Sequence, residues 1–101
     1  MLDIEKLREA LLPPLLPYGL RRLSIFGSVA RGDDEPGSDL DVLVEFEVPR
    51  RKPLGLVEYG RLEDELSARA GKKVDLVFRS ALKPRVRPYV EHDEVVLYEA
   101  A

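Results

Sequence analysis

The sequence predicts a small two-layer domain of the α/β or α+β class, in which helices pack on a sheet of a few strands. Residues 40–46 alternate apolar and polar side chains, as a strand with one buried face does. Residues 54–70 instead repeat apolar side chains at helical spacing. The chain of 101 residues is 45% hydrophobic and 35% charged, which predicts a single domain over residues 1–101 with one core.

The N-terminal segment predicts a helix that two prolines interrupt. Asp3 is suited to cap the helix. Its apolar side would carry Leu7, Leu11 and Leu12. A proline lacks the backbone N–H and clashes with the preceding turn, so Pro13 and Pro14 are expected to disrupt the helix near residue 12.

Two strands with a short helical turn between them are predicted next. Residues 20–26 supply the apolar bulk of the first strand, and residues 28–31 can form one turn that Gly32 ends. An acidic turn over residues 33–38 then leads into the strand at residues 40–46.

The second half begins with a Pro- and Arg-containing loop over residues 47–53, followed by the helix at residues 54–70, which Gly71 ends. The expected buried stripe of this helix is Leu56, Tyr59, Leu62, Leu66 and Ala70. Its expected exposed ion pairs are Arg61–Glu65 and Glu65–Arg69.

The C-terminal third predicts a strand at residues 73–78, a short helix at residues 84–91 and a strand or extended tail at residues 95–98. The long helix between the strands at residues 40–46 and 73–78 makes the whole an alternation of helices and strands. This alternation is what predicts the two-layer class.

Composition excludes several classes of function. The absence of cysteine excludes disulfides and thiolate metal sites, and a net charge of −3 predicts no strong direct binding of nucleic acid. No apolar run is long enough to cross a membrane, and Asp3 and Glu5 stand where a signal peptide would be basic. A cytoplasmic location is therefore predicted. The absence of Asn, Gln and Thr fits a heat-adapted (thermophile-like) source or a biased genomic base composition.

The most informative stretch joins a Gly-Ser turn to a pair of aspartates. Gly27 and Ser28 follow an apolar strand, and Asp39 and Asp41 come two residues apart at the start of the next one. Side chains at i and i+2 of a strand share a face, where two carboxylates can bind a divalent cation. A strand with one wet face can carry the same pattern, but two acids on one face repel each other unless a cation lies between them.

The Gly-Ser turn and the charges around it each allow two interpretations. Ser28 can cap the short helix, or the turn can bind phosphate through its N–H groups; the two do not exclude each other. Arg31 can reach a phosphate or pair with Asp33 or Asp34, and the structural ion pair is favoured. Asp75 is the one charge in a segment that reads as a buried strand. It can pair with a nearby cation, or join the aspartate pair in a two-metal site.

Other polar and aromatic residues favour structural roles. The basic turn of Arg50, Arg51 and Lys52 is expected to be solvated, with contact to an acceptor or partner protein as the alternative. His92, the single histidine, is expected on the surface near a helix end. The scattered tyrosines are expected to pack rather than stack on bases; they are Tyr18, Tyr59, Tyr89 and Tyr98.

The string Gly-Ser-Val-Ala-Arg-Gly, followed by Ser-Asp-Leu-Asp-Val-Leu-Val, resembles the polymerase-β-type nucleotidyltransferases and their small prokaryotic branch, the minimal nucleotidyltransferases. The resemblance covers nearly the whole chain. It implies a small mixed sheet backed by helices, an ATP substrate and two Mg²⁺ ions. It also implies catalytic and metal-binding roles for Asp39, Asp41 and Asp75. The implied nucleotide-binding residues are Gly27, Ser28, Arg31 and Ser38.

The resemblance also implies a partner, because minimal nucleotidyltransferases commonly act as antitoxins of HEPN-domain toxins. The expected reaction is transfer of AMP from ATP to a hydroxyl, with a tyrosine of the HEPN partner as the expected acceptor. Two alternatives remain open at this stage. One is a binding module that sequesters the partner without chemistry, and the other is a nucleotidyltransferase for a small molecule or an RNA end.

Overall fold

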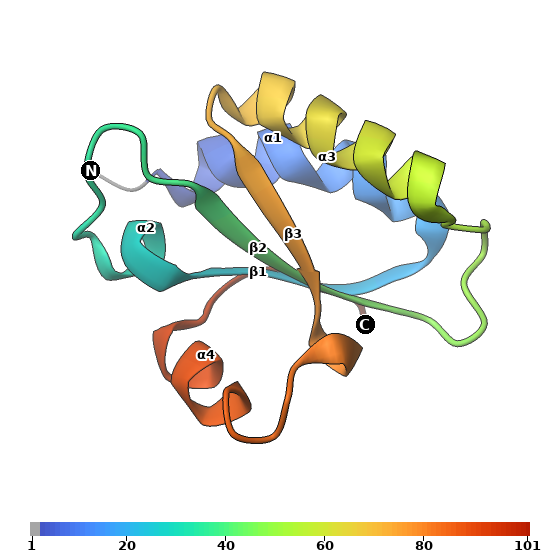
Figure 1. The fold of residues 1–101 in the computed structure, drawn as a ribbon. Coiled ribbons are helices and arrows are strands. Elements are labelled where there is room, and N and C mark those ends of the chain that lie inside the picture. The colour runs from blue at the N-terminus through green and yellow to red at the C-terminus, as the bar shows by residue number, and fades with distance from the viewer. Residues whose placement is uncertain (1–2) are drawn as a thin grey trace.

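The computed structural model describes residues 3–101, which form a mixed four-stranded sheet with helices on both faces (Figure 1). The strands are β1 (Leu20–Phe26), β2 (Leu40–Phe46), β3 (Val74–Phe78) and β4 (Val95–Glu99). Their order in the sheet is β3-β2-β1-β4, with β1 antiparallel to β2 and β4 and with β2 parallel to β3. The predicted class and the three strands predicted at residues 20–26, 40–46 and 73–78 are confirmed. Residues 95–98, predicted as a strand or an extended tail, belong to strand β4.

The helices divide between the two faces of the sheet. They are α1 (Ile4–Leu15), α2 (Gly27–Arg31), α3 (Leu56–Ala70) and α4 (Arg87–Asp93), with short 3₁₀ turns η1 (Leu16–Tyr18) and η2 (Arg79–Ala81). Figure 1 shows α1 and α3 side by side over one face and α4 beneath the other. No helix within residues 3–101 combines the length and apolar character that crossing a bilayer requires.

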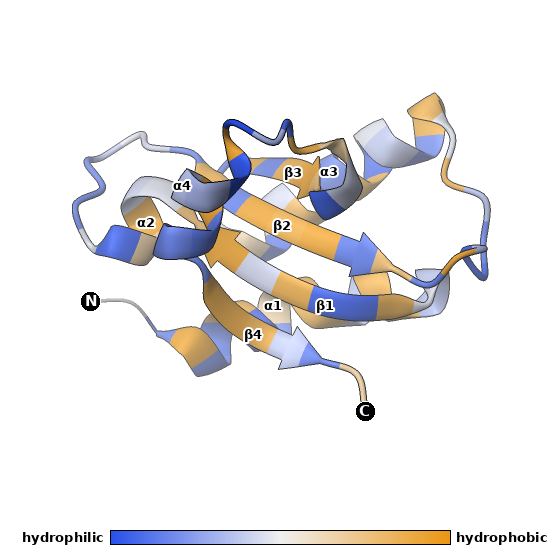
Figure 2. Cartoon of the chain, turned by 90° about the horizontal axis from the view of Figure 1, so that it is seen from below, coloured by the Kyte–Doolittle hydropathy of each residue, from blue (hydrophilic) through white to orange (hydrophobic). Residues whose placement is uncertain are grey.

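The core lies between the α1–α3 layer and the sheet. Leu11 and Leu15 of α1 and Leu62 and Leu66 of α3 are buried against alternate side chains of the central strands. The buried strand residues on this core include Leu23, Ile25, Leu40, Val42, Val44 and Leu76. Figure 2 shows apolar residues along most of β2 and at the centre of the sheet. Leu43 points to the opposite side and is buried as well, since α2 and α4 lie over that face.

The prediction that Pro13 and Pro14 disrupt the first helix is wrong, because α1 continues through both to Leu15. A proline at position i leaves the carbonyl of residue i−4 without its helical donor. The two carbonyls concerned belong to Glu9 and Ala10, and both accept hydrogen bonds from Arg69 of α3. The guanidinium donates through Nε to Ala10 at 2.6 Å and through Nη2 to Glu9 at 3.0 Å. Arg69 therefore replaces the donors that the prolines lack.

This replacement predicts a measurable loss of stability in Arg69→Ala. Hydrogen bonds from charged donors contribute about 1.5–3 kcal/mol each at most, and these are exposed, so we expect the free energy of unfolding to fall by about 1–2 kcal/mol. Chemical denaturation measures this loss. Arg61→Ala, an exposed substitution in the same helix, is the matched control and should change stability by less than about 0.5 kcal/mol. Equal effects of the two variants would contradict the role given to Arg69.

Three further features of α3 differ from the sequence expectation. The helix begins at Leu56 rather than at residue 54, and Leu56 is 88% exposed instead of buried. Within residues 3–101 neither Arg61–Glu65 nor Glu65–Arg69 forms an ion pair, and Arg69 reaches across to α1 instead. Glu63 and Tyr59 turn instead toward β3, where Glu63 accepts a hydrogen bond from the Leu76 N–H at 2.8 Å.

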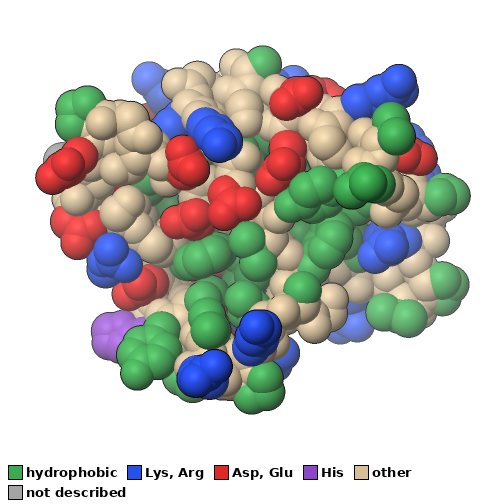
Figure 3. All heavy atoms as spheres, in the orientation of Figure 1, with side chains coloured by type: hydrophobic (Ala, Val, Ile, Leu, Met, Phe, Trp, Pro, Cys, Tyr) green, Lys and Arg blue, Asp and Glu red, His purple; other side chains and the backbone are tan. Residues whose placement is uncertain are grey.

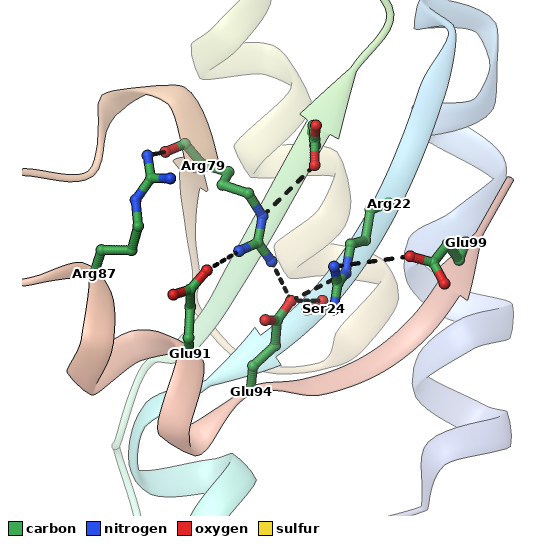
Figure 4. A network of polar contacts seen from close by, with 8 residues as sticks. Arg22, Ser24, Arg79, Arg87, Glu91, Glu94 and Glu99 are labelled. Carbon is green, nitrogen blue, oxygen red and sulfur yellow. Dashed lines mark hydrogen bonds and ion pairs between the residues drawn. The ribbon is translucent and has the colours of Figure 1, made fainter. Parts of the chain in front are cut away.

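A buried ionic network fixes α4 and β4 to the sheet (Figure 4). Glu94, whose side chain is 6% exposed, accepts hydrogen bonds from Ser24 of β1 and from Arg79. Arg79 also pairs with Glu91 at 3.0 Å, and Arg22 approaches Glu94 at 3.4 Å. The helix predicted at residues 84–91 lies further toward the C-terminus, because α4 begins at Arg87 and ends at Asp93. Asp93 directly precedes the anchored Glu94.

Candidate active site

The Gly-Ser turn joins the end of β1 to α2 and lies against the aspartate pair. Gly27 adopts a φ of +78°, and a Cβ atom built on it would overlap the Oδ2 atom of Asp41 and lie 3.2 Å from its Cγ. Only glycine can therefore occupy this position while the Asp41 carboxylate stays in place. Ser28 follows as the second residue of α2, so the start of this helix and the carboxylate lie side by side.

The register of the sheet sets the positions of the three carboxylates. Asp41 pairs with Phe26 of β1 on one side and with Asp75 of β3 on the other. Residues that pair directly across two strands project to the same face, and Asp39 projects to that face because it lies two residues before Asp41. Order across the sheet is thus the Gly27–Ser28 turn, then Asp41, then Asp75.

The interpretation of Asp75 as a charge within a buried strand is wrong. Val74 and Leu76 are buried, but Asp75 is exposed, because β3 is the edge strand and its outward face is not covered at this point. A carboxylate exposed to water has no desolvation cost to offset, so Asp75 does not need a cationic partner or a metal ion on that ground. The pairing with Asp41 is what places it in the candidate site.

Electrostatics at the site are dominated by the crowding of these carboxylates. Burial raises the pKa of Asp41, and the negative charges of Asp75 and Asp39 raise that pKa further, while Arg31 opposes the shift. A cation placed beside Asp41 would offset the repulsion that raises the pKa of this carboxyl. Within residues 3–101 no group of three or more acidic or histidine side chains meets the geometry of a ready-formed metal site. The donor chemistry nevertheless suits Mg²⁺, which prefers carboxylates together with water and phosphate oxygens.

Figure 3 shows acidic side chains gathered near the middle of the face in view, with hydrophobic side chains directly beside them.

A family model described as the nucleotidyltransferase domain matches residues 4–97 of this chain. The chain belongs to the nucleotidyltransferase domain family. It is an enzyme of the nucleotidyltransferase class, as its sequence resemblance implied.

Relatives and solved structures agree with this assignment. A candidate protein adenylyltransferase of Methanocaldococcus jannaschii is 33% identical over 94 residues, which are 93% of this chain and 97% of that protein. Protein adenylyltransferase MntA of Thermococcus cleftensis is 38% identical over 79 residues, 77% of this chain and 75% of its own length. The solved structure of a candidate minimal nucleotidyltransferase has a TM-score of 0.71 and 39% identity, covering 93% of this chain and 95% of that one.

Toxin–antitoxin complexes share the fold at lower identity. The complex of a tri-AMPylated Shewanella oneidensis HEPN toxin with its MNT antitoxin contains a chain with a TM-score of 0.65 and 18% identity to this nucleotidyltransferase. The match covers 96% of this chain and 70% of that one. At this identity the likeness concerns the fold.

The remaining residues predicted to bind nucleotide have structural partners in this nucleotidyltransferase. Arg31 pairs with Asp33 at 3.2 Å, which confirms the favoured structural interpretation, and with Asp93 of α4 at 2.7 Å. Both acids raise the pKa of the guanidinium. Ser38 closes the acidic turn, where its Oγ accepts a hydrogen bond from the Glu35 N–H at 2.9 Å. The contact between Arg31 and Asp93 could not be predicted from the sequence, because the two residues lie 62 positions apart.

The other expectations for polar and aromatic residues are confirmed with one exception. In the basic turn, Arg51 pairs with Glu47 at 3.0 Å and the turn is exposed. His92 is exposed in the last turn of α4. Tyr18, Tyr59 and Tyr98 pack against the core, but Tyr89 is 75% exposed, so the prediction that it packs is wrong.

Proposed function

We propose that this nucleotidyltransferase transfers AMP from ATP to a tyrosine hydroxyl of a HEPN-domain partner and thereby acts as its antitoxin, in a reaction that depends on Mg²⁺. One observation carries the proposal: the register of β1, β2 and β3 places Asp41 between the Gly27–Ser28 turn and Asp75. The groups proposed to bind phosphate, to bind metal and to activate the acceptor are therefore adjacent on one face. The names of the relatives and the HEPN complex of the fold relative support AMP and a HEPN toxin as the group and the partner.

Each part of the site has a distinct role in the proposed reaction. The backbone N–H groups and hydroxyl at Gly27–Ser28 hold the phosphates of ATP. Because Gly27 has no Cβ, the Asp41 carboxylate lies directly against this turn and hence beside those phosphates. Asp39 and Asp41 would hold Mg²⁺, with Asp75 completing the site on the acceptor side. Mg²⁺ bound at these carboxylates would neutralise charge on the phosphates and lower the pKa of the attacking hydroxyl.

The bond changes are those of an in-line displacement at phosphorus. The acceptor oxygen forms a bond to the α-phosphorus as the bond from that phosphorus to the bridging α–β oxygen breaks, and pyrophosphate leaves. The proton of the acceptor hydroxyl passes to Asp75 or, through it, to water. Positioning and charge neutralisation provide most of the rate enhancement in chemistry of this kind.

The proposal is tested by mass spectrometry of the co-expressed HEPN partner after incubation with the nucleotidyltransferase, ATP and Mg²⁺. We expect AMP on a tyrosine of the partner, and loss of this product when a chelator removes Mg²⁺. An adduct on serine, or one that forms equally in the presence of chelator, would overturn the corresponding part of the proposal.

A growth assay separates catalysis from sequestration. The double variant Asp39→Asn/Asp41→Asn should bind the partner but fail to neutralise it in growing cells. Neutralisation by this variant would show that the chain acts as a binding module. Transfer to RNA or to a small molecule in the absence of partner would instead favour a nucleotidyltransferase with another acceptor. A cytoplasmic location remains a prediction that fits either outcome.

A further inference from the structure

A groove of about 550 Å³ lies along the edge strand β3 and has Asp75 among its lining residues. Its walls come from the loop before α3, the first turns of α3, β3 and η2, and they include Leu54, Leu56, Tyr59, Phe78 and Ala81. Of its described lining residues, Asp75 alone is charged. The apolar surface beside the carboxylates in Figure 3 lies over these elements. This groove could not be predicted from the sequence, because Leu56 was expected to be buried in the core.

The groove lies on the acceptor side of the site. The Gly27–Ser28 turn adjoins Asp41 from β1, whereas the groove adjoins Asp75 from the opposite edge of the sheet. A nucleotide held at the turn leaves the β3 edge open to the second substrate. We propose that this groove is the acceptor subsite and that it takes the aromatic ring of a protein tyrosine, with the hydroxyl directed toward Asp75. This inference rests on the proposed function and adds to it the surface that selects the acceptor.

The edge of β3 determines how an acceptor can bind. An exposed edge strand normally offers its free backbone groups to an added strand. Here α3 already satisfies three of them: Ser67 accepts from the Val74 N–H at 2.9 Å, Glu63 accepts from the Leu76 N–H at 2.8 Å, and the Tyr59 hydroxyl donates to the Leu76 carbonyl. These bonds oppose extension of the sheet by an added strand at Val74 and Leu76, and so favour an acceptor that inserts a side chain.

The walls of the groove favour an aromatic side chain. Tyr18, Phe46, Phe78 and Tyr59 form a chain of edge-to-face contacts, with successive ring centroids 6.1, 5.9 and 5.8 Å apart. The last two rings line the groove, so an inserted ring can continue the same arrangement. The hydroxyl of Tyr59 itself is not an acceptor, since burial and the charge of Glu63 raise the pKa of Tyr59 to about 12 and its proton is donated to Leu76.

Leu56 provides a test that leaves the fold intact. Its side chain lines the groove and is 88% exposed, so Leu56→Ser removes apolar contact area from the ligand but little from the core. Val57→Ser is the matched control, because Val57 is the next residue of α3, is 63% exposed and does not line the groove. The probe is N-acetyl-tyrosinamide, compared with N-acetyl-serinamide and a short RNA oligonucleotide. Binding to ¹⁵N-labelled protein is followed by NMR with Mg²⁺ and a non-hydrolysable ATP analogue.

We expect the tyrosine probe to shift the amide signals of Tyr59, Phe78 and Ala81, with the serine probe and RNA causing no such shifts. Leu56→Ser should weaken binding about tenfold, the loss expected when one apolar side chain no longer contacts the ligand. Val57→Ser should bind as the wild type does. Shifts confined to another surface, stronger perturbation of the groove by RNA, or equal weakening by both variants would overturn the inference.

The signals of Gly27 and Ser28 keep this test distinct from that of the proposed function. If the ATP analogue shifts them and the tyrosine probe leaves the groove unchanged, the groove inference fails and nucleotide transfer stands. If the analogue does not shift them while the tyrosine probe binds the groove, the proposed role of the turn fails and the groove is still a tyrosine site.

Discussion

Gly27→Ala should cause the largest combined loss of stability and activity of any single methyl group added to this chain. A left-handed backbone conformation costs a residue with a Cβ about 1–2 kcal/mol. At Gly27 that Cβ also overlaps the Asp41 carboxylate, so we expect a total loss of about 2–4 kcal/mol in the free energy of unfolding. Displacing Asp41 by about 1 Å should reduce the rate of nucleotidyl transfer about 100-fold or more.

Gly32→Ala is the matched control for this prediction. Gly32 has a φ of +80°, almost the same as Gly27, but a Cβ built on it meets nothing within 4 Å. The control should therefore lose only the backbone contribution of about 1–2 kcal/mol and keep its activity. Urea denaturation and a pyrophosphate-release assay on both variants measure the difference. Similar losses in the two proteins would mean that close contact with Asp41 is not what requires Gly27.

Asp41→Asn should abolish transfer without destabilising the metal-free protein. If Asp41 holds the metal, its loss removes several kcal/mol of charge stabilisation, which corresponds to at least about 100- to 1000-fold in rate. The ionised carboxylate is disfavoured by burial and by the charges of Asp75 and Asp39, so replacing it with a neutral amide removes that penalty. We expect the Tm of the variant at pH 7 to equal or exceed that of the wild type.

The pH dependence of this difference has a defined sign. Because the pKa of Asp41 is raised above its usual 3.8, the folded protein binds this proton more tightly than the unfolded chain does. The stabilisation from the protonated group is complete below pH 3.8 and is lost as the pH rises through the raised pKa. The Tm advantage of Asp41→Asn should thus be largest at neutral pH and small near pH 3.5. A variant with a lower Tm at pH 7 would contradict the crowding of charges at this site.

The parts of the fold that depend on neighbouring residues could be predicted from the sequence. The alternation of apolar and polar side chains in residues 40–46 predicted β2. The spacing of the Gly27–Ser28 turn from Asp39 and Asp41 indicated nucleotide chemistry. The helix ends were predicted equally well: Asp3 accepts a hydrogen bond from the Lys6 N–H at the start of α1, and Gly32 ends α2 with a positive φ.

Features that depend on distant residues could not be predicted in this way. The continuation of α1 through Pro13 and Pro14 requires Arg69, a residue whose sequence position suggested an ordinary surface pair within α3. Asp93 and Glu94 hold Arg31 and Arg79 across long stretches of chain. The exposure of Leu56 follows from where α3 begins, which no local pattern specified. For Asp75, the sequence indicated a buried strand environment, whereas the residue is exposed because β3 lies at the edge of the sheet.

The most direct test of the central claim is transfer of label from ATP to the co-expressed HEPN partner, with α-labelled and γ-labelled ATP run in parallel. The account predicts label on the partner from the α position alone, in the presence of Mg²⁺, and none with the Asp39→Asn/Asp41→Asn protein. Label from the γ position, or α-label that persists in this double variant, would contradict nucleotidyl transfer at the carboxylates of β2.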